Sequence, residues 1–145
     1  MDRSRPAPLP LAGEGSAPSV RAGAASGDAL DIYHIWCSLK DDVGDLEFAA
    51  ALRGYLEHLK GRGLLVDYRV TRRKLGLGPA HLPEWHVTLD FDDLSQLDNA
   101  FKSVSSRADP VESFHHAVNS KVKEVFFALY RDFPDPQRVA GQEKF

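Results

Sequence analysis

Histidines are the side chains of this sequence best suited to proton transfer near neutral pH. His34 lies within DIYHIWCSLK and His86 within EWHVTLDF, and both stretches alternate in the way that β-strands do. This alternation puts His34 on the same strand face as Trp36, and His86 on the same face as Thr88. Opposite side chains on neighbouring strands lie about 4.5–5.5 Å apart. If the two strands are neighbours, we therefore expect the two imidazoles to share one site.

Three further side chains point to the same sheet face by the same alternation: Arg69 and Thr71 in LLVDYRVTRRK, and Tyr130 in EVFFALYRDF. Imidazole can shuttle a proton, a guanidinium can hold a carboxylate or an enolate, and a phenol can donate a hydrogen bond. The alternative is a hydrogen-bonded polar layer at an interface. We predict four catalytic residues and three ligand-binding residues on this face: His34, His86, Arg69 and Tyr130, then Trp36, Thr71 and Thr88.

A second pair of histidines, His115 and His116, is adjacent in FHHAVNS. On a helix they diverge by about 100°, so they do not easily bind one metal ion. One of them is expected to face the sheet and to reach a pocket between helix and sheet, so both are predicted as ligand-binding candidates. Haem ligation by one of them, and a divalent metal on His34, His86 and Glu84, are minor alternatives. No Cys-x-x-Cys or His-Glu-x-x-His spacing supports a metal, and we predict neither a metal site nor a cofactor.

A basic strip, RVTRRKLGLGP, offers Arg69, Arg72, Arg73 and Lys74 to an anion. Its glycines match no phosphate-binding loop, so a solvated strand end is the favoured interpretation. The single cysteine, Cys37, falls on the opposite strand face from His34. There it should behave as a small buried hydrophobe rather than as a nucleophile.

The elements that must position these residues follow in a definite order. In chain order we expect a strand at 31–39, a helix with Asp45 as N-cap and His58 on its polar side, and strands at 64–74 and 84–91. A helix beginning near Asp93, a helical piece opened by DPVE with Asp109 as N-cap and Pro110 as N1, and a last strand in EVFFALYRDF follow. The last strand is apolar on both faces and is expected to be covered on both sides. The order β-α-β-β-α-β predicts an α+β, ferredoxin-like fold with an antiparallel sheet of order 4-1-3-2 and the helices on one face.

The other face of this sheet carries a large amount of apolar surface for a monomer. Its apolar residues are Ile32, Trp36, Phe126, Ala128 and Tyr130. Because no further element is available to cover them, we expect a second copy to pack sheet against sheet, burying at least about 1,200 Å². The predicted partner is thus the chain itself, as a homodimer, together with a small-molecule ligand.

This pattern resembles the dimeric α+β barrel superfamily over about residues 31–133. That superfamily includes antibiotic-biosynthesis monooxygenases, stress-responsive barrel proteins and muconolactone isomerase. The stretches DIYHIWCSLK, RRKLGLGP, FHHAVNS and ALYRDFPDP are similar to a family of short bacterial proteins of unknown function, which lends no reaction. The resemblance implies a cofactor-independent isomerase, cyclase or monooxygenase acting on a small hydrophobic or aromatic acid. The alternatives are a non-catalytic barrel that binds a small ligand or a protein and, as a minor one, a haem- or metal-binding barrel.

Composition and charge bear on the partners, the compartment and the domain bounds. The net charge of −3 over 145 residues gives no basic field that would attract nucleic acid. The sequence contains no run of about 18 apolar residues, so it predicts no membrane span. A single cysteine fits a reducing compartment, most simply the cytoplasm. Residues 1–29 are rich in Pro, Ala, Gly and Ser, which predicts a disordered extension and a start codon assigned too early. We expect one domain over residues 30–134 and a flexible tail over residues 135–145.

Overall fold

The computed structural model describes residues 29–134, 136 and 138–142. Apart from Ala29, the predicted N-terminal extension lies outside the described residues, as do parts of the predicted C-terminal tail. The chain divides into two units, one of Asp31–Tyr130 and one of Met1–Leu30 with Arg131–Phe145. In the second unit, the Leu30 amide donates to Asp132 Oδ2 at 3.0 Å, and the Asp132 amide donates to the Leu30 carbonyl oxygen at 3.0 Å. All candidate site residues lie in the first unit.

The element order is close to the one predicted. It runs β2 (Asp31–Leu39), α1 (Asp45–Gly61), β3 (Asp67–Arg72), β4 (Trp85–Phe91), α2 (Leu94–Ser105), α3 (Val111–Asn119) and β5 (Val122–Arg131). The strands form one four-stranded antiparallel sheet in the order β3-β4-β2-β5. This is the predicted order 4-1-3-2 read from its other end, so the predicted ferredoxin-like fold is confirmed.

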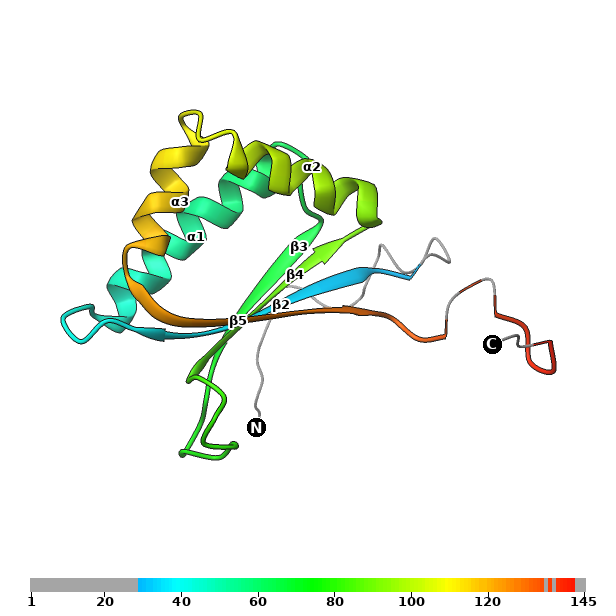
Figure 1. Cartoon of the computed structure of the whole chain (residues 1–145), viewed down its shortest axis with the longest axis horizontal. Helices are drawn as coiled ribbons and strands as arrows, with labels where there is room; N and C mark the ends of the chain where they lie inside the picture. Colours follow the sequence, from blue (N-terminus) through cyan, green and yellow to red (C-terminus); the bar gives the residue numbers. More distant parts are fainter. Residues whose placement is uncertain (1–28, 135, 137, 143–145) are drawn as a thin grey trace, which may run out of the picture. The chain divides into compact units, whose positions relative to one another are not determined.

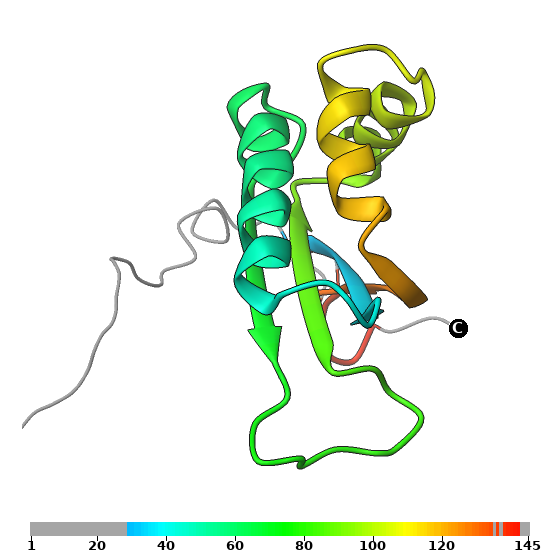
Figure 2. The same cartoon turned by 90° about the vertical axis from the view of Figure 1, so that its left-hand side faces the viewer.

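The three helices lie on one face of the sheet (Figures 1 and 2). β4 shows why, since its residues are alternately buried and half-buried, and the buried ones form a continuous apolar row under the helices. α1 contributes apolar residues at helical spacing, and full burial of each such side chain stabilises the fold by about 1.5–3 kcal/mol. The buried residues of these two elements are Phe48, Leu52, Leu56 and Leu59 of α1 with Trp85, Val87, Leu89 and Phe91 of β4.

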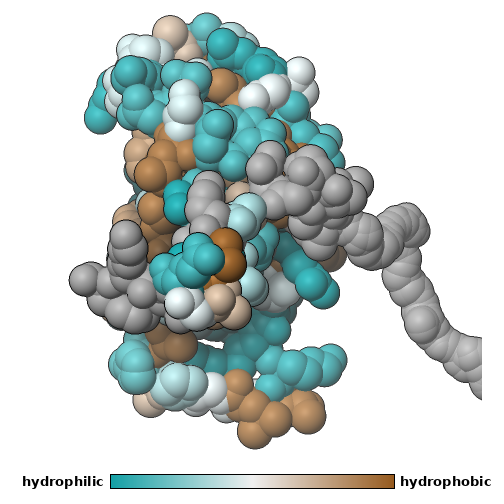
Figure 3. Space-filling model, turned by 90° about the vertical axis from the view of Figure 1, so that its right-hand side faces the viewer, coloured by the Kyte–Doolittle hydropathy of each residue, from teal (hydrophilic) through white to brown (hydrophobic). Residues whose placement is uncertain are grey.

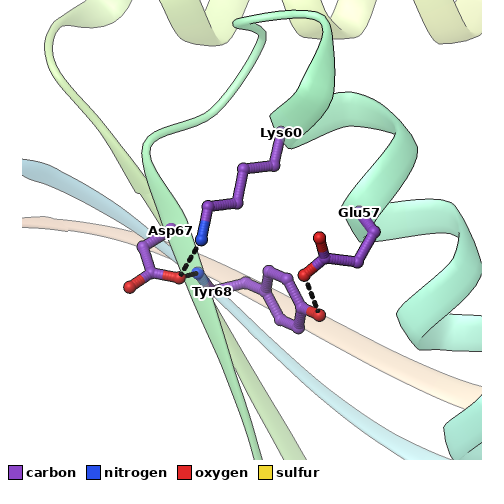
Figure 4. A network of polar contacts seen from close by, with 4 residues as sticks. All are labelled: Glu57, Lys60, Asp67 and Tyr68. Carbon is purple, nitrogen blue, oxygen red and sulfur yellow. Dashed lines mark hydrogen bonds and ion pairs between the residues drawn. The ribbon is translucent and has the colours of Figure 1, made fainter. Parts of the chain in front are cut away.

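A polar network on the surface links α1 to β3 (Figure 4). The Tyr68 hydroxyl donates to Glu57 Oε2 at 2.7 Å, and Lys60 Nζ donates to Asp67 Oδ1 at 3.2 Å. Because Glu57 and Lys60 are exposed to solvent, each of these contacts contributes little to the stability of the fold.

Two helix starts differ from the prediction by one residue. The N-cap of α1 is Gly44, and Asp45 is its first helical residue. The N-cap of α3 is Pro110, so the prediction that Asp109 caps and Pro110 opens this helix was wrong by one position. The Asp109 carboxylate still accepts hydrogen bonds from the Ser113 amide at 3.2 Å and the Ser113 hydroxyl at 2.7 Å. It therefore satisfies a backbone donor of the first turn from just outside the helix.

His58 also differs from its expected place on the polar side of α1. Its ring stacks on Phe114 of α3 with the centroids 4.9 Å apart. The reason is that α1 packs against α3 as well as against β3, which turns this side of the helix into an interface.

β5 is the strand least covered by the chain itself. It forms one edge of the sheet, while α1 packs over β3 and α2 packs over β4. Apolar residues from both faces of β5 are consequently exposed, among them Phe126 at 48%, Phe127 at 59% and Leu129 at 50%. The predicted cover on both faces of this strand is not supplied by residues 31–130.

None of the helices in the described part of the chain combines the length and the apolar character needed to cross a membrane.

Candidate functional site

A cavity of about 610 Å³ lies between the helices and the sheet. This volume falls within the range of about 300–1,000 Å³ that is typical of small-molecule sites. Its walls are mostly apolar and come from the sheet and from all three helices, for example Ile35 on β2, Leu52 on α1, Val104 on α2 and Val118 on α3. The hydrophobic core of this domain is thus hollow on one side.

Among the polar side chains in this wall are two phenols and an imidazole: Tyr33 on β2, Tyr55 on α1 and His115 on α3. On α2, Lys102 and Asp98, which form an ion pair at 3.1 Å, also line the cavity. The rings of Tyr55 and His115 have their centroids 5.6 Å apart. Burial, with a smaller contribution from nearby Tyr33, raises the pKa of Tyr55 to about 12, and burial also raises the pKa of Tyr33. Both phenols are therefore neutral hydrogen-bond donors at physiological pH, and Tyr55 lies next to an imidazole, a group that can accept a proton.

An aromatic group lines the cavity between α2 and β5. Tyr33 meets Phe101 edge-on at 5.3 Å between ring centroids and stacks with Phe127 at 5.6 Å. Phe101 and Phe127 are also 45% and 59% exposed, so the cavity reaches the surface where they stand. Figure 3 shows apolar surface below a mostly hydrophilic upper part of the molecule.

The opposite face of the sheet holds two histidines, His34 on β2 and His86 on β4. β2 and β4 are antiparallel neighbours with His34 opposite Thr88 and Trp36 opposite His86. His34 Nδ1 and His86 Nε2 lie 2.9 Å apart in a hydrogen bond. The expected proximity of the two imidazoles is thus present, because both lie on central strands of the sheet.

Aromatic rings extend this histidine pair across the sheet. Trp36 stacks on His86 with 4.6 Å between centroids and 3° between planes, and His34 stacks on His86 at 5.2 Å. Tyr130 of β5 meets His34 edge-on at 4.7 Å. Trp36, His86, His34 and Tyr130 together are called the ring row below.

The pKa values of both histidines of the pair are lowered. Burial lowers the pKa of His34, partly offset by the charge of Asp90, and burial together with the charge of His34 lowers the pKa of His86. A hydrogen bond between two imidazoles needs one N–H donor and one bare nitrogen acceptor. The geometry therefore requires that at least one of the two rings is neutral.

The remaining predicted residues of this face are in register with the ring row. Arg69 lies opposite Thr88, and Thr71 lies opposite His86 and donates its hydroxyl to the His86 carbonyl oxygen at 2.8 Å. The cavity, however, is on the other side of the sheet, and none of these predicted residues lines it. Their catalytic and ligand-binding roles stay predictions.

Of the two adjacent histidines on α3, His115 lines the cavity and His116 is exposed. Sequence reasoning assigned no function to Tyr33 and Tyr55, because their spacing marks them only as core positions. The signal that could have found them is their hydroxyl group, since a buried phenol needs either a polar partner or a ligand.

The basic strip has protein partners. Arg72 donates to Glu84 at 2.6 Å and to Asp45 at 2.9 Å, and its guanidinium lies 5.0 Å from the centre of the Trp85 ring. Arg73 donates to the carbonyl oxygens of Pro79 and Leu82. These contacts agree with a structural role for the strip.

At the bottom of Figure 3, apolar side chains stand out on the loop between β3 and β4, which carries the exposed Leu75 and Leu77.

Cys37 is 3% exposed within the core, and burial raises the pKa of its thiol to about 11, as expected of a cysteine that only packs. Within the described residues, no group of three or more His, Cys, Asp or Glu side chains could hold a metal ion. His115 is the described imidazole that lines the cavity and could ligate a haem iron there.

Several solved structures share this fold. A protein of Arabidopsis thaliana matches with a TM-score of 0.58 and 11% identity, covering 72% of this chain and 96% of its own. A dimeric ferredoxin-like protein of unknown function from Jannaschia sp. CCS1 matches with a TM-score of 0.53 and 8% identity, covering 70% and 97%. The hydroxynitrile lyase of Passiflora edulis matches with a TM-score of 0.53 and 13% identity, covering 72% and 97%. At such identities these likenesses show the fold alone.

No curated protein matches the sequence. One family does match, over residues 30–145, which is most of the chain. The protein therefore belongs to a family of unknown function, DUF6614, with a ferredoxin-like fold.

Proposed function

We propose that this protein is a homodimeric α+β barrel that binds a small hydrophobic or aromatic acid between its helices and its sheet. In this proposal it converts that ligand by acid–base chemistry with its own side chains. The observation that carries the proposal is the apolar cavity of about 610 Å³ with Tyr33, Tyr55 and His115 in its wall. An apolar site with a few polar groups is the usual form of a small-molecule site.

The chemistry follows from what these three groups can do. His115 can take a proton from a carbon next to a carbonyl or carboxyl group, and a neutral phenol at Tyr55 or Tyr33 can donate a hydrogen bond to the oxygen that becomes negative. Apolar walls strengthen both interactions because they exclude water. Isomerases and cyclases that work through an enolate need this combination. The likeness to a hydroxynitrile lyase supports the view that this fold can hold an active site.

The homodimer is supported by the open face of the sheet. Phe126 and Tyr130 are 48% and 59% exposed there, beside the half-buried Ile32 and Trp36. Within residues 31–130, no helix or strand covers this face. A matching structure of the same fold is a dimeric ferredoxin-like protein, which supports self-association as the way in which the face is covered.

Ligand binding can be tested with 1-anilinonaphthalene-8-sulfonate, a fluorescent aromatic acid. We expect saturable binding of one probe per chain to the wild type. Val104→Trp places an indole in the cavity wall and should abolish this binding, whereas Leu46→Trp, at a residue of α1 that is 81% exposed, should not. Equal binding by both variants would place the probe elsewhere and contradict the proposed site.

Catalysis can be tested without knowing the substrate. Arylacetic acids incubated in D₂O with the protein should exchange their α-hydrogens, as followed by proton NMR. His115→Gln should slow this exchange by about 10²–10⁴-fold, the usual contribution of a general base. His116→Gln removes the neighbouring, exposed imidazole and serves as the matched control.

A non-catalytic binding protein is the second candidate, and the predominance of apolar groups in the cavity wall favours it. It predicts that the wild type binds the probe and catalyses no exchange of any acid.

Haem binding is a minor candidate, favoured by the position of His115 alone. It predicts that added haemin gives a sharpened and shifted Soret band, and that this change is lost in His115→Gln.

A further inference from the structure

We propose that self-association of this protein is linked to protons through the histidine pair on the open face of its sheet. In the dimer, His34 and His86 are covered by the second copy, and loading the pair with a second proton separates the copies. This inference rests on the homodimer of the proposed function and adds a regulation to it. The ring row of Trp36, His86, His34 and Tyr130 is then part of the interface rather than part of the ligand site.

The geometry of the pair sets its response to protons. His34 Nδ1 and His86 Nε2 are 2.9 Å apart, so one proton lies between them. A pair that carries one extra proton can keep this bond. If both rings were imidazolium, however, two N–H groups and two positive charges would face each other across the same gap. Trp36 and Tyr130 flank the rings on both sides, so the rings cannot turn apart without disturbing the row.

The charged and titratable groups around the pair are arranged as in an interface. By register and alternation they are Asp67 and Arg69 on β3, Asp90 on β4, and Glu124 and Tyr130 on β5. Asp90 favours protonation of His34 but does not offset burial, the larger effect, and the pKa of His34 is lowered. The ring row is therefore aromatic and neutral near pH 7, while the charged groups lie on the edge strands β3 and β5 and, in the case of Asp90, near the end of β4. An apolar centre with a polar rim is what a protein–protein interface requires.

A second copy fits this face better than another partner. A two-fold interface pairs the same patch from both chains, so a neutral aromatic centre meets another neutral aromatic centre without repulsion. Single-stranded nucleic acid also stacks on exposed rings, but it needs a basic groove along its backbone. Arg69 is the basic group beside the ring row on β3, and Asp67 and its register partner Asp90 put negative charge on the same strand pair.

The direction of the effect follows from linkage. Covering the pair strengthens the burial that already opposes its protonation, so the separated chains bind more protons than the dimer does. Association is then strongest above the pKa of the pair in the separated chain and weakens as the pH falls through that value. If each chain releases one proton on association, the dimer releases two. The dissociation constant of the dimer then rises by up to about 100-fold for each unit by which the pH falls.

Sedimentation equilibrium on the full chain at pH 7.5 and pH 5.5, at one ionic strength, tests this proposal. We expect a dimer at pH 7.5 and a dissociation constant at least about tenfold weaker at pH 5.5, with the circular dichroism unchanged. His34→Asn with His86→Gln removes both titrating groups and should remove most of this pH dependence. If the double variant does not fold, His34→Asn alone should still flatten it. His116→Gln, an exposed imidazole on α3, should keep the wild-type response.

The outcomes separate the two proposals. A dimer equally tight at both pH values would overturn the proton linkage and leave the homodimer standing. A monomer at both pH values would overturn the homodimer and the linkage with it. Unfolding of the wild type at pH 5.5, or saturable binding of a labelled RNA oligonucleotide that is lost in Trp36→Ala, would also count against the proposal.

Discussion

The two faces of the sheet are built from the same strands but differ in what covers them. Under the helices, Val87 and Phe91 are 1% exposed and belong to a packed core that is hollowed on one side. On the open face, His34, Trp36 and His86 are half-buried by one another rather than by another layer. Each strand contributes to both faces because its side chains alternate.

This difference separates two kinds of chemistry. Groups that could act on a ligand, Tyr55 and His115, lie on helices and face a cavity whose walls are apolar. Groups with lowered pKa, His34 and His86, lie on the central strands and face outward. A cluster of imidazoles on a sheet is therefore not by itself a ligand site, since a site also needs a concave space.

The largest expected effect is on folding stability and concerns the covered face. Leu52→Ala removes a side chain that is 4% exposed and should destabilise the chain by about 2–5 kcal/mol. His86→Ala, on the open face, should cost much less. Urea denaturation of both variants at one protein concentration measures this difference, and equal losses would show that the histidine is as structural as the leucine.

For self-association, the substitution on the open face should have the larger effect and the one on the helix side the smaller effect. Trp36→Ala removes the largest ring of the open face and should weaken the dimer by about 2 kcal/mol or more, as aromatic interface anchors do, while Leu46→Ala on the exposed side of α1 should change nothing. Sedimentation velocity over a dilution series measures both. A dimer that tolerates Trp36→Ala without weakening would mean that the open face is not the interface.

An alkaline titration probes the cavity wall. Because the pKa of Tyr55 is raised to about 12 from an ordinary 10.0, the unfolded chain loses this proton before the folded chain does. The stability tied to this phenol is thus fully present below pH 10 and is lost as the pH rises from 10 to about 12. Absorbance at 295 nm should lose amplitude in the late part of the titration in Tyr55→Phe, and a loss of amplitude near pH 10 instead would contradict a buried phenol.

The smallest expected effect concerns the polar network between α1 and β3. Tyr68→Phe removes the hydrogen bond to Glu57 and should cost less than about 1 kcal/mol, because the carboxylate is exposed and water can replace the phenol. Thermal unfolding measures this change. A loss as large as that of Leu52→Ala would make the network a main support of the sheet.

The fold could be predicted because its signals are local. Alternation from Trp85 to Phe91 fixed which residues face the helices, and the order of elements then placed β2 beside β4. Those two steps also brought His34 and His86 together on one face. The helical spacing of Phe48, Leu52, Leu56 and Leu59 located α1 in the same way.

A pocket between helix and sheet was predicted only for one of His115 and His116. The extent of the cavity could not be predicted, because it depends on how far the helices stand from the sheet near β5. Periodicity marks Tyr33 and Tyr55 as core residues and does not say whether the space beside them is filled. The place of His58 against Phe114 was missed for a similar reason, since helix-to-helix contacts depend on packing angles. Homodimerisation was predicted from surface composition alone and stays a proposal.

One measurement compares the two faces directly. The chain has six histidines, and they include His115 in the cavity wall and His34 and His86 on the open face. Imidazole NMR signals followed during titration with 1-anilinonaphthalene-8-sulfonate at pH 7.5 should shift for His115 and stay unchanged for His34 and His86. Shifts of the His34 and His86 signals with an unmoved His115 signal would place the ligand on the open face and contradict the division of the sheet into a ligand face and an association face.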